Sequence, residues 1–285
     1  PDSSQYNLSG KVTGALNIKG SSSQPNISGN ITSPALSAMG NNLSNLNLNF
    51  AFANNALSIT KGAANLNNSP VNLTGSVKNL TAKNPDIDFN LSSPSFNASG
   101  AKLNNLSAKI SGNINNLNAE IKANNLNASG ASVNNINIKA SGNLNNLTAN
   151  LSAASISASE LKLNNLSAKV TGNLDNLNAD INANNLSAGG LSFNNLNTQL
   201  VKKGNNINFS GLNLKSPFGN LALNGGYNIA KNNLNFKINA DALDLAKLAD
   251  GVPDLKGNLS GIANLDFNLS GNINNLQGSG ALKSQ

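Results

Sequence analysis

The chain has 285 residues, of which 39% are apolar and only 4% aromatic, and it contains no Trp, His, Cys or Arg. Asn accounts for about a fifth of the sequence, and a net charge of +7 arises from 19 Lys against 12 acidic residues spread along the chain. The absence of Cys excludes disulfides and thiolate metal sites. The lack of a dense Lys/Arg stripe with stacking aromatics argues against nucleic-acid binding.

Residues 1–110 form an irregular first segment in which short runs alternate apolar and polar residues. Such runs span residues 12–18, 46–52 and 87–91, and Gly, Ser, Pro and Asn separate them. This pattern predicts short strands joined by turns. We expect the Pro residues to lie in the connections, where a missing backbone donor costs no ladder hydrogen bond.

Residues 111–200 are three abutting copies of one 30-residue repeat, which begin at Ser111, Ser141 and Thr171. A fixed period of this kind marks an array in which no single unit buries its apolar face alone. Within the copies, pairs of Asn recur about every ten residues, and each pair is expected to form a turn. The repeat is therefore predicted to contain three strands, and the whole chain some 25 strands. The Asn pairs are Asn115-Asn116, Asn124-Asn125, Asn134-Asn135 and Asn145-Asn146.

Strict alternation in the repeats predicts a strand array with one dry and one wet face. Lys and Asp residues of the repeats fall in the polar phase, so the apolar lining from Ile87 to Ala240 is expected to be continuous and uncharged. The lining residues are predicted to be Leu117, Ala119, Ile121, Leu126, Ile136, Ile138, Leu147, Leu151, Leu161, Leu163, Leu177, Ile181, Phe193, Ile207, Phe209, Leu234, Phe236 and Ile238.

Residues 201–285 form the last segment, which continues as strands with one interruption. Apolar residues at helical spacing predict one short helix over residues 242–249, capped by Asp241 and stopped by Gly251 and Pro253. Strands are expected to resume at Leu255. The three segments, 1–110, 111–200 and 201–285, are interpreted as one continuous elongated domain.

The residues needed for catalysis or metal binding are scarce. Nucleophilic catalysis by Ser or Cys needs an adjacent base, most often His, and the chain has no His. Carboxylate pairs at Asp86/Asp88 and Asp241/Asp244 are better explained by a solvated strand face and by helix capping. Asp250 and Asp254 alone do not make a hard-cation loop, which needs several oxygen ligands at set spacing. We therefore expect no enzyme activity, catalytic residue, cofactor or metal. The dry face remains, either as a closed interior or as an open trough that holds something apolar.

The two end segments share Gly-punctuated phrases. In the first, residues 8–20 read LSGKVTGALNIKG and residues 25–29 read PNISG. In the last, a Leu/Ala helix leads through Pro253 to the Gly-punctuated runs 255–261, 264–271 and 275–280. These phrases resemble those of the TamB and AsmA-like family of bacterial envelope proteins, whereas the Asn-rich repeats between them depart from the usual variety of the family.

The resemblance implies an all-β fold called a β-taco, an elongated half-pipe with an apolar groove. It implies a non-enzymatic, periplasm-spanning protein that carries phospholipid between inner and outer membranes or supports outer-membrane protein assembly. Expected partners are phospholipid acyl chains and an Omp85-type outer-membrane barrel, with no nucleic acid, and the chain is expected to be a monomer. The implied location is the periplasm, with an inner-membrane anchor outside this sequence.

The alternative is a three-sided β-helix of a secreted or surface-attached adhesin. Three strands of about ten residues per repeat suit one β-helical rung. In a meander, three strands per repeat would make equivalent strands alternate in direction. The strand arithmetic thus favours the β-helix, whereas the end segments favour the β-taco.

Overall fold

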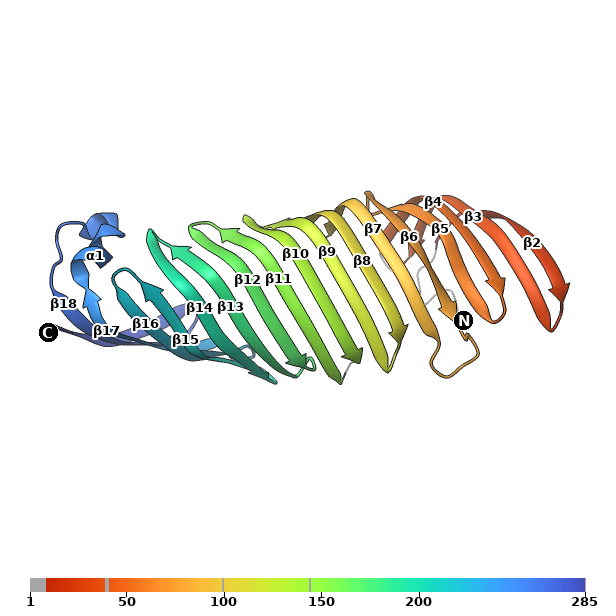
Figure 1. Cartoon of the computed structure of the whole chain (residues 1–285). Helices are drawn as coiled ribbons and strands as arrows, with labels where there is room; N and C mark the ends of the chain where they lie inside the picture. The colour runs from red at the N-terminus through yellow and green to blue at the C-terminus, as the bar shows by residue number, and fades with distance from the viewer. Residues whose placement is uncertain (1–8, 39–40, 99, 144, 285) are drawn as a thin grey trace. The chain divides into compact units, whose positions relative to one another are not determined.

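The computed structural model describes residues 9–38, 41–98, 100–143 and 145–284, and nearly all of them lie in strands (Figure 1). The strands form one antiparallel sheet of 19 strands, and the described residues contain one short α-helix. The sheet is open, because β2 and β19 each pair along one side only. The predicted all-β class is confirmed.

The chain divides into two compact units. Unit 1 falls within Pro1–Ser129 and Asn134–Asn143, and unit 2 within Gly130–Val133 and Leu144–Gln285, so that β10 contributes to both. The strands up to β10 are β1 (Ser9–Gly10), β2 (Thr13–Ser21), β3 (Gln24–Ala38), β4 (Asn41–Ala53), β5 (Ala56–Leu66), β6 (Ser69–Lys78), β7 (Asp86–Ala98), β8 (Ala101–Asn113), β9 (Asn116–Ala128) and β10 (Ala131–Asn143).

Unit 2 continues with nine strands, a short α-helix and a 3₁₀ turn. These elements are β11 (Asn146–Ala158), β12 (Leu161–Gly172), β13 (Asn176–Ala188), β14 (Leu191–Lys203), β15 (Asn206–Ser216), β16 (Gly219–Asn228), β17 (Asn233–Asp244), α1 (Leu245–Asp250), η2 (Pro253–Leu255), β18 (Ile262–Asn272) and β19 (Asn275–Ser284).

Each strand from β2 onwards pairs with the strand that follows it in the chain. The register of β13 on β14, for example, runs without a shift from Asn176↔Lys203 to Ala188↔Leu191. Strands joined by turns of a few residues must be antiparallel, whereas a β-helix stacks parallel strands. The three-sided β-helix is therefore wrong for this chain.

The 30-residue repeat contains two strands, not three. The second repeat, for example, covers the end of β10, all of β11 and most of β12. In each repeat a pair of strands of 12 or 13 residues alternates with two short turns. Equivalent strands of successive repeats consequently run in the same direction. With three strands per repeat, equivalent strands of a meander would have alternated in direction. With two strands per repeat they do not, so this argument against a meander does not apply.

The Asn pairs that predicted the extra turns lie inside strands. Asn124-Asn125 belongs to β9 and Asn134-Asn135 to β10. In alternate strands the second Asn of such a pair has a left-handed backbone, with φ of 51° at Asn105, 52° at Asn165 and 55° at Asn195. Asn adopts this conformation more readily than other non-glycine residues. Each of these residues bends its strand while the register with the preceding strand is kept. On its other side, Asn195 lies where the pairing of β14 with β15 shifts register.

Two Pro residues lie opposite such bends rather than in connections. Pro94 of β7 faces Asn105, between the pairs Ser93↔Leu106 and Ser95↔Asn104. Pro34 of β3 faces Asn45 in the same way. The physical reason for the prediction holds, because the ladder is interrupted at these points and Pro has no N–H to contribute. The predicted location was wrong for these two residues, whereas Pro85 and Pro217 do lie between strands.

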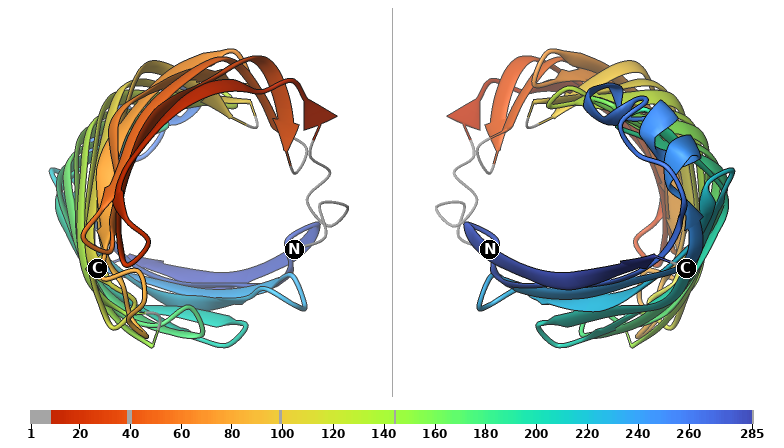
Figure 2. Two further views of the ribbon diagram at one scale, coloured as in Figure 1. Left: turned by 90° about the vertical axis from the view of Figure 1, so that its right-hand side faces the viewer. Right: turned by 90° about the vertical axis from the view of Figure 1, so that its left-hand side faces the viewer.

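At each bend the alternation of inward and outward side chains shifts by one residue. The apolar positions of the sequence change phase at the same point, so the apolar residues before and after the bend lie on one side of the sheet. In β14, Phe193 precedes the bend and Leu196 follows it, and both belong to one apolar cluster. The strands in each unit curve along their length (Figure 2). Ala123 and Ala153, which lie next to the bends, are buried although the described residues place no second layer over β9 and β11. Side chains converge only on the inner side of a curved sheet, so the apolar residues occupy the concave side.

The largest core of unit 2 forms around α1. Phe193, Leu214, Phe218, Ala240 and Leu243 are buried together, and Leu245 and Leu248 pack against them. The rings of Phe193 and Phe218 meet edge to face at 5.5 Å.

The helix was predicted three residues too early and too long. It spans Leu245–Asp250, and its N-cap is Asp244, whose carboxylate accepts a hydrogen bond from the backbone N–H of Lys247. Asp241 pairs with Asn220 in the sheet instead. Nor do strands resume at Leu255, which ends η2; β18 begins at Ile262.

Candidate functional site

The concave side of each unit carries the predicted lining residues, here called the apolar face. Most of them are half-buried and lie in the phase that the alternation predicted. In unit 1 these are Leu117, Ala119, Ile121, Leu126, Ile136 and Ile138; in unit 2 they are Leu147, Leu151, Leu163, Leu177, Ile181, Ile207, Phe209, Leu234, Phe236 and Ile238.

Two predicted residues differ from the rest. Leu161 is 42% exposed at the start of β12. Phe193 is buried in the cluster beside α1, so protein already covers its side chain. The apolar surface that unit 2 offers to a ligand therefore excludes Phe193 and lies on the strands that α1 leaves uncovered.

Cross-strand pairs make the apolar face of unit 2 continuous from one strand to the next. Leu151 of β11 lies opposite Ala168 of β12, which in turn lies opposite Ile181 of β13. Small residues alternate with large ones along this row. Close packing of this kind leaves a smooth aliphatic surface without polar side chains at these positions.

Two phenyl rings extend this surface over a glycine. Gly225 of β16 lies directly between Phe209 of β15 and Phe236 of β17. The two rings approach to 5.1 Å between centroids. A Cβ atom at Gly225 would come within 2.2 Å of the Phe236 ring, so the glycine makes room for the pair.

Lys202 of β14 overturns the prediction of an uncharged lining. It lies opposite Leu177 on one side and Ile207 on the other, so its register is that of the apolar face. Its side chain is half-buried, and its ammonium Nζ donates to the carbonyl oxygen of Leu174 in the neighbouring turn. The aliphatic stem thus covers apolar surface while the charge reaches the rim. Lys202 lies two residues after Leu200 and therefore in the same phase of the alternation, so the sequence pattern could have identified it as a residue of the apolar face.

The other side of the sheet is polar and carries the remaining charges of the repeats. Glu120 of β9 accepts hydrogen bonds from Lys122 at 2.8 Å and lies 3.7 Å from Lys139 of β10. The Lys122 ammonium, as hydrogen-bond donor, holds the pKa of the Glu120 carboxyl below its ordinary value. Such exposed pairs contribute little stability, and they mark this side as the solvated one.

Asp86 is less exposed than the alternation predicted. Its two carboxylate oxygens accept hydrogen bonds from the side-chain amides of Asn79 and Asn113, each at 3.1 Å. These bonds tie the β6–β7 connection to the end of β8. Asp86 is therefore accounted for by a structural role.

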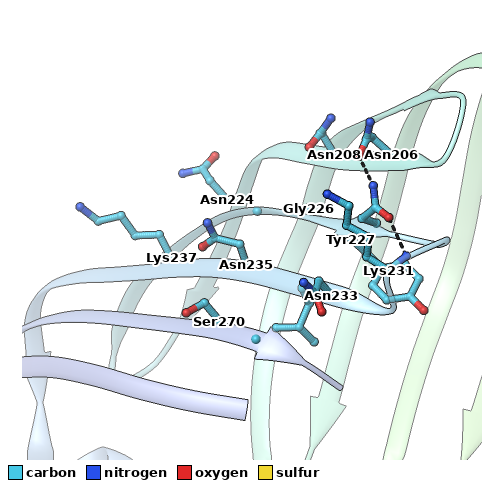
Figure 3. Close-up of a pocket in the computed structure, with 14 residues that line it drawn as sticks. Asn206, Asn208, Asn224, Gly226, Tyr227, Lys231, Asn233, Asn235, Lys237 and Ser270 are labelled. Atoms are coloured by element: carbon cyan, nitrogen blue, oxygen red, sulfur yellow. Dashed lines mark hydrogen bonds between the residues drawn. The ribbon is translucent and has the colours of Figure 1, made fainter. Parts of the chain in front are cut away.

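A hollow of 670 Å³ opens on the polar side of β15 to β18 (Figure 3). Asn208, Asn224 and Asn235 line it together with Lys237, and it is open to solvent. The missing side chain of Gly226 shapes its floor, because a Cβ there would lie 2.5 Å from Asn208 Oδ1. Nearby, Asn228 Nδ2 donates to Asn206 Oδ1 at 2.7 Å. Lys231, Tyr227 and Ser270 also line the hollow, so its polar groups are amides, two ammonium groups and two hydroxyls, with no His, Cys, Asp or Glu among the lining residues.

Within the described ranges, no group of three or more His, Cys, Asp or Glu is placed to hold a metal ion. Across the same part of the chain, no helix is both long and apolar enough to cross a membrane. The apolar face is therefore the most extensive candidate site.

Comparison with known proteins yields no relative: no family model, curated protein or solved structure matches this chain.

Proposed function

We propose that the apolar face is an open groove that binds the acyl chains of phospholipid. The observation that supports this proposal is an aliphatic concave surface with one charged side chain, Lys202, whose ammonium turns out to the rim. A charge facing the middle of such a surface would cost several kcal/mol to desolvate. Acyl chains need no hydrogen-bond partners, and the hydroxyl of Thr198 and the ammonium of Lys202, which share this phase, already donate to backbone carbonyls.

The role of the chain in a cell is proposed from its resemblance to the TamB and AsmA-like family. It would carry phospholipid between the two membranes of a bacterial envelope, with support of outer-membrane protein assembly as a related role. The expected periplasmic location, the Omp85-type partner and the monomeric state belong to the same proposal. The open sheet with an apolar concave side is compatible with it.

The groove is tested by placing a charge on the apolar face of unit 2. We expect the purified chain to co-isolate phospholipid, measured by mass spectrometry of an organic extract. Leu151→Asp should reduce the lipid recovered per chain at least about tenfold, because the carboxylate must be desolvated wherever an acyl chain covers it. The matched control is Asn150→Asp, which places the same carboxylate on the exposed neighbour in the polar phase.

Circular dichroism separates loss of lipid from loss of fold. A folded Leu151→Asp variant that still carries a full load of lipid would show the groove assignment to be wrong. Equal loss in Asn150→Asp would do the same, since that residue lies on the other side of the sheet.

A further inference from the structure

One edge of the sheet in unit 2 carries four consecutive turns, here called the turn ridge. They join β12 to β13, β14 to β15, β16 to β17 and β18 to β19. Three of them have an aliphatic residue at the tip, and these residues are among the most exposed apolar side chains described: Leu174 is 80%, Ile273 50% and Ile229 44% exposed. Aliphatic tips at three turns of one edge call for an explanation, because turns usually carry polar residues.

The turns of the ridge are tied to one another by backbone hydrogen bonds. Gly204 donates to the carbonyl of Asp175 at 2.8 Å, and Ile229 donates to that of Asn205 at 2.8 Å. Ile273 continues the series by donating to Asn232 at 3.0 Å. The tips are therefore held in a fixed row, and the exposed side chains are presented by an ordered backbone.

On the opposite edge of unit 2, the three described hairpin turns have no exposed aliphatic tip, and the longer β17–β18 connection exposes Leu255 to 38% and Leu259 to 36%, less than any of the three tips of the ridge. The β11–β12 turn contains Ser159 and Glu160, and the β13–β14 turn contains Gly189 and Gly190. At the β15–β16 turn the aromatic residue, Phe218, is buried in the core. The hairpin turns with exposed aliphatic tips in the described part of unit 2 therefore all lie on one edge.

Lysines lie between the aliphatic tips. Lys202 and Lys203 end β14, and Lys231 lies in the β16–β17 turn. The only acidic residue in the four described turns is Asp175. Lys203 and Lys231 are exposed, and Lys202 sends its ammonium to the carbonyl of Leu174 beside the first tip. The ridge is thus both apolar at its tips and positive between them.

We propose that the turn ridge docks unit 2 onto the surface of an anionic lipid bilayer. Single aliphatic side chains can sink separately among lipid headgroups, and each lysine near an anionic membrane adds attraction. The core of a protein interface is usually a closely packed apolar patch, whereas here the end of β14, with Lys203, and the Gly204-Asn205 turn separate Leu174 from Ile229. This inference does not depend on lipid binding by the apolar face.

The test uses the absence of Trp from the chain, which allows a single Trp to report on one turn. Leu174→Trp should shift its fluorescence to the blue when vesicles of phosphatidylglycerol and phosphatidylethanolamine are added. Glu160→Trp is the matched control, since Glu160 is exposed in the β11–β12 turn of the opposite edge, outside the apolar face, and should not respond. No shift at position 174, or equal shifts at both positions, would overturn the proposal.

Vesicle co-sedimentation tests the contributions of charge and aliphatic tips. Lys203→Glu with Lys231→Glu should weaken binding to the same vesicles by roughly fivefold or more per lysine, and high salt should have the same direction of effect. Lys162→Glu with Lys215→Glu, exposed lysines outside the ridge, should not. Equal loss in the two pairs would show a general charge effect and contradict a docking ridge.

A combined Leu174→Asn, Ile229→Asn, Ile273→Asn variant should also lose vesicle binding while keeping its far-UV circular dichroism. If these substitutions instead abolish self-association in sedimentation velocity, and the parent chain does not bind vesicles, the ridge joins copies of this chain and the membrane proposal fails. Leu151→Asp should bind vesicles normally, which distinguishes failure of docking from failure of the groove.

Discussion

Asn residues set much of the backbone geometry of this sheet. In hairpin turns such as Asn54-Asn55, both residues have positive φ, the geometry that matches the twist of the flanking strands. In turns of the Gly-Asn-x-Asn-Asn type, the first Asn side chain accepts from the backbone N–H two residues later, as Asn113 does from Asn115 at 3.1 Å. In the strands, single Asn residues provide the bends. One residue type therefore serves three positions with different surroundings.

The in-strand bends can be tested at Asn194 and Asn195, two adjacent exposed residues of β14. Only Asn195 has a positive φ. Because a β-branched residue is strained in the left-handed region, Asn195→Val should lower the free energy of unfolding by about 1–2 kcal/mol. Urea denaturation followed by circular dichroism measures the effect.

Asn194→Val is the control for side-chain chemistry and should change stability by less than about 0.5 kcal/mol. Asn195→Gly should be tolerated, because Gly adopts positive φ without strain. If Val at position 195 proves as harmless as Val at position 194, the bend does not depend on that residue.

The helix α1 and the 3₁₀ turn η2 together interrupt the strands of the described chain. The helix has only six residues, so its stability comes from its N-cap and from packing on the Phe193 cluster rather than from its length. The backbone N–H of Lys247, which donates to Asp244 at 3.1 Å, holds the pKa of the Asp244 carboxyl below its ordinary value. The Lys247 ammonium, 3.0 Å from the carboxylate, acts in the same direction.

Acid should therefore loosen α1. A carboxyl whose pKa is lowered on folding stabilises the folded state above its unfolded pKa, and this contribution is lost as the pH falls through the folded pKa. We expect backbone amides of residues 245–250 to exchange faster as the pH falls through the carboxyl range, after correction for intrinsic rates.

Asp244→Ala should raise this exchange at neutral pH and remove its added dependence on acid. Asp241→Ala, which changes the residue that sequence reasoning chose as the cap, should leave exchange in α1 unchanged. Hydrogen exchange with mass spectrometry distinguishes the two assignments; faster exchange in the Asp241 variant alone would contradict the observed cap.

The sequence predicts the class and the faces of the elements better than their boundaries. Alternation from Leu147 to Leu151 identified the apolar side of β11, because the two-residue period survives in any curved strand. Asn pairs did not distinguish a hairpin from a bend: Asn115 lies in a turn, whereas Asn135 lies within β10. A left-handed Asn is locally acceptable in both places, and only pairing with neighbouring strands decides between them.

The sequence predicts less of the candidate site. It identified half-buried residues such as Ile181 on the apolar face, but it gave no indication that α1 would cover Phe193. It also placed no charge in the lining, although Lys202 lies two residues after Leu200 and in the same phase. Because each repeat has two strands, every second turn lies on the same edge of the sheet. The three-strand prediction could not place these turns side by side, and so it could not predict the turn ridge.

For the whole molecule, the structural unit is a hairpin of 30 residues. Odd and even strands of the repeats are not interchangeable. In β12 the left-handed Asn is the fifth residue of the strand, whereas β13 has no such residue. Their apolar residues also begin in different phases, at Leu161 in β12 and at Leu177, the second residue of β13.

Removal of whole units should therefore be tolerated. Deletion of residues 161–190 joins the turn Ser159-Glu160 to Leu191, so that β14 takes the place of β12 with its bend and phase retained. This variant should fold, with a slightly lower thermal midpoint because one interface of the array is lost.

Deletion of residues 161–175 removes one strand and should be far more damaging. It brings β13 into the place of β12 with its apolar residues out of phase, and a slip of one residue turns them to the other side. Thermal unfolding monitored by circular dichroism compares the two deletions. Equal stability would show that the hairpin is not the repeating unit.

The pairing of consecutive strands has a consequence for how the chain reaches its fold. Every strand from β2 to β18 finds its next partner within the following few tens of residues, so no early segment waits for a distant one. Folding of local contacts is fast, and it exposes unpaired strand edges for a short time only. A chain that emerges from a ribosome or a translocation channel could thus add one hairpin at a time to the growing edge. A longer array would then need more such steps, but each step would still pair only neighbouring strands.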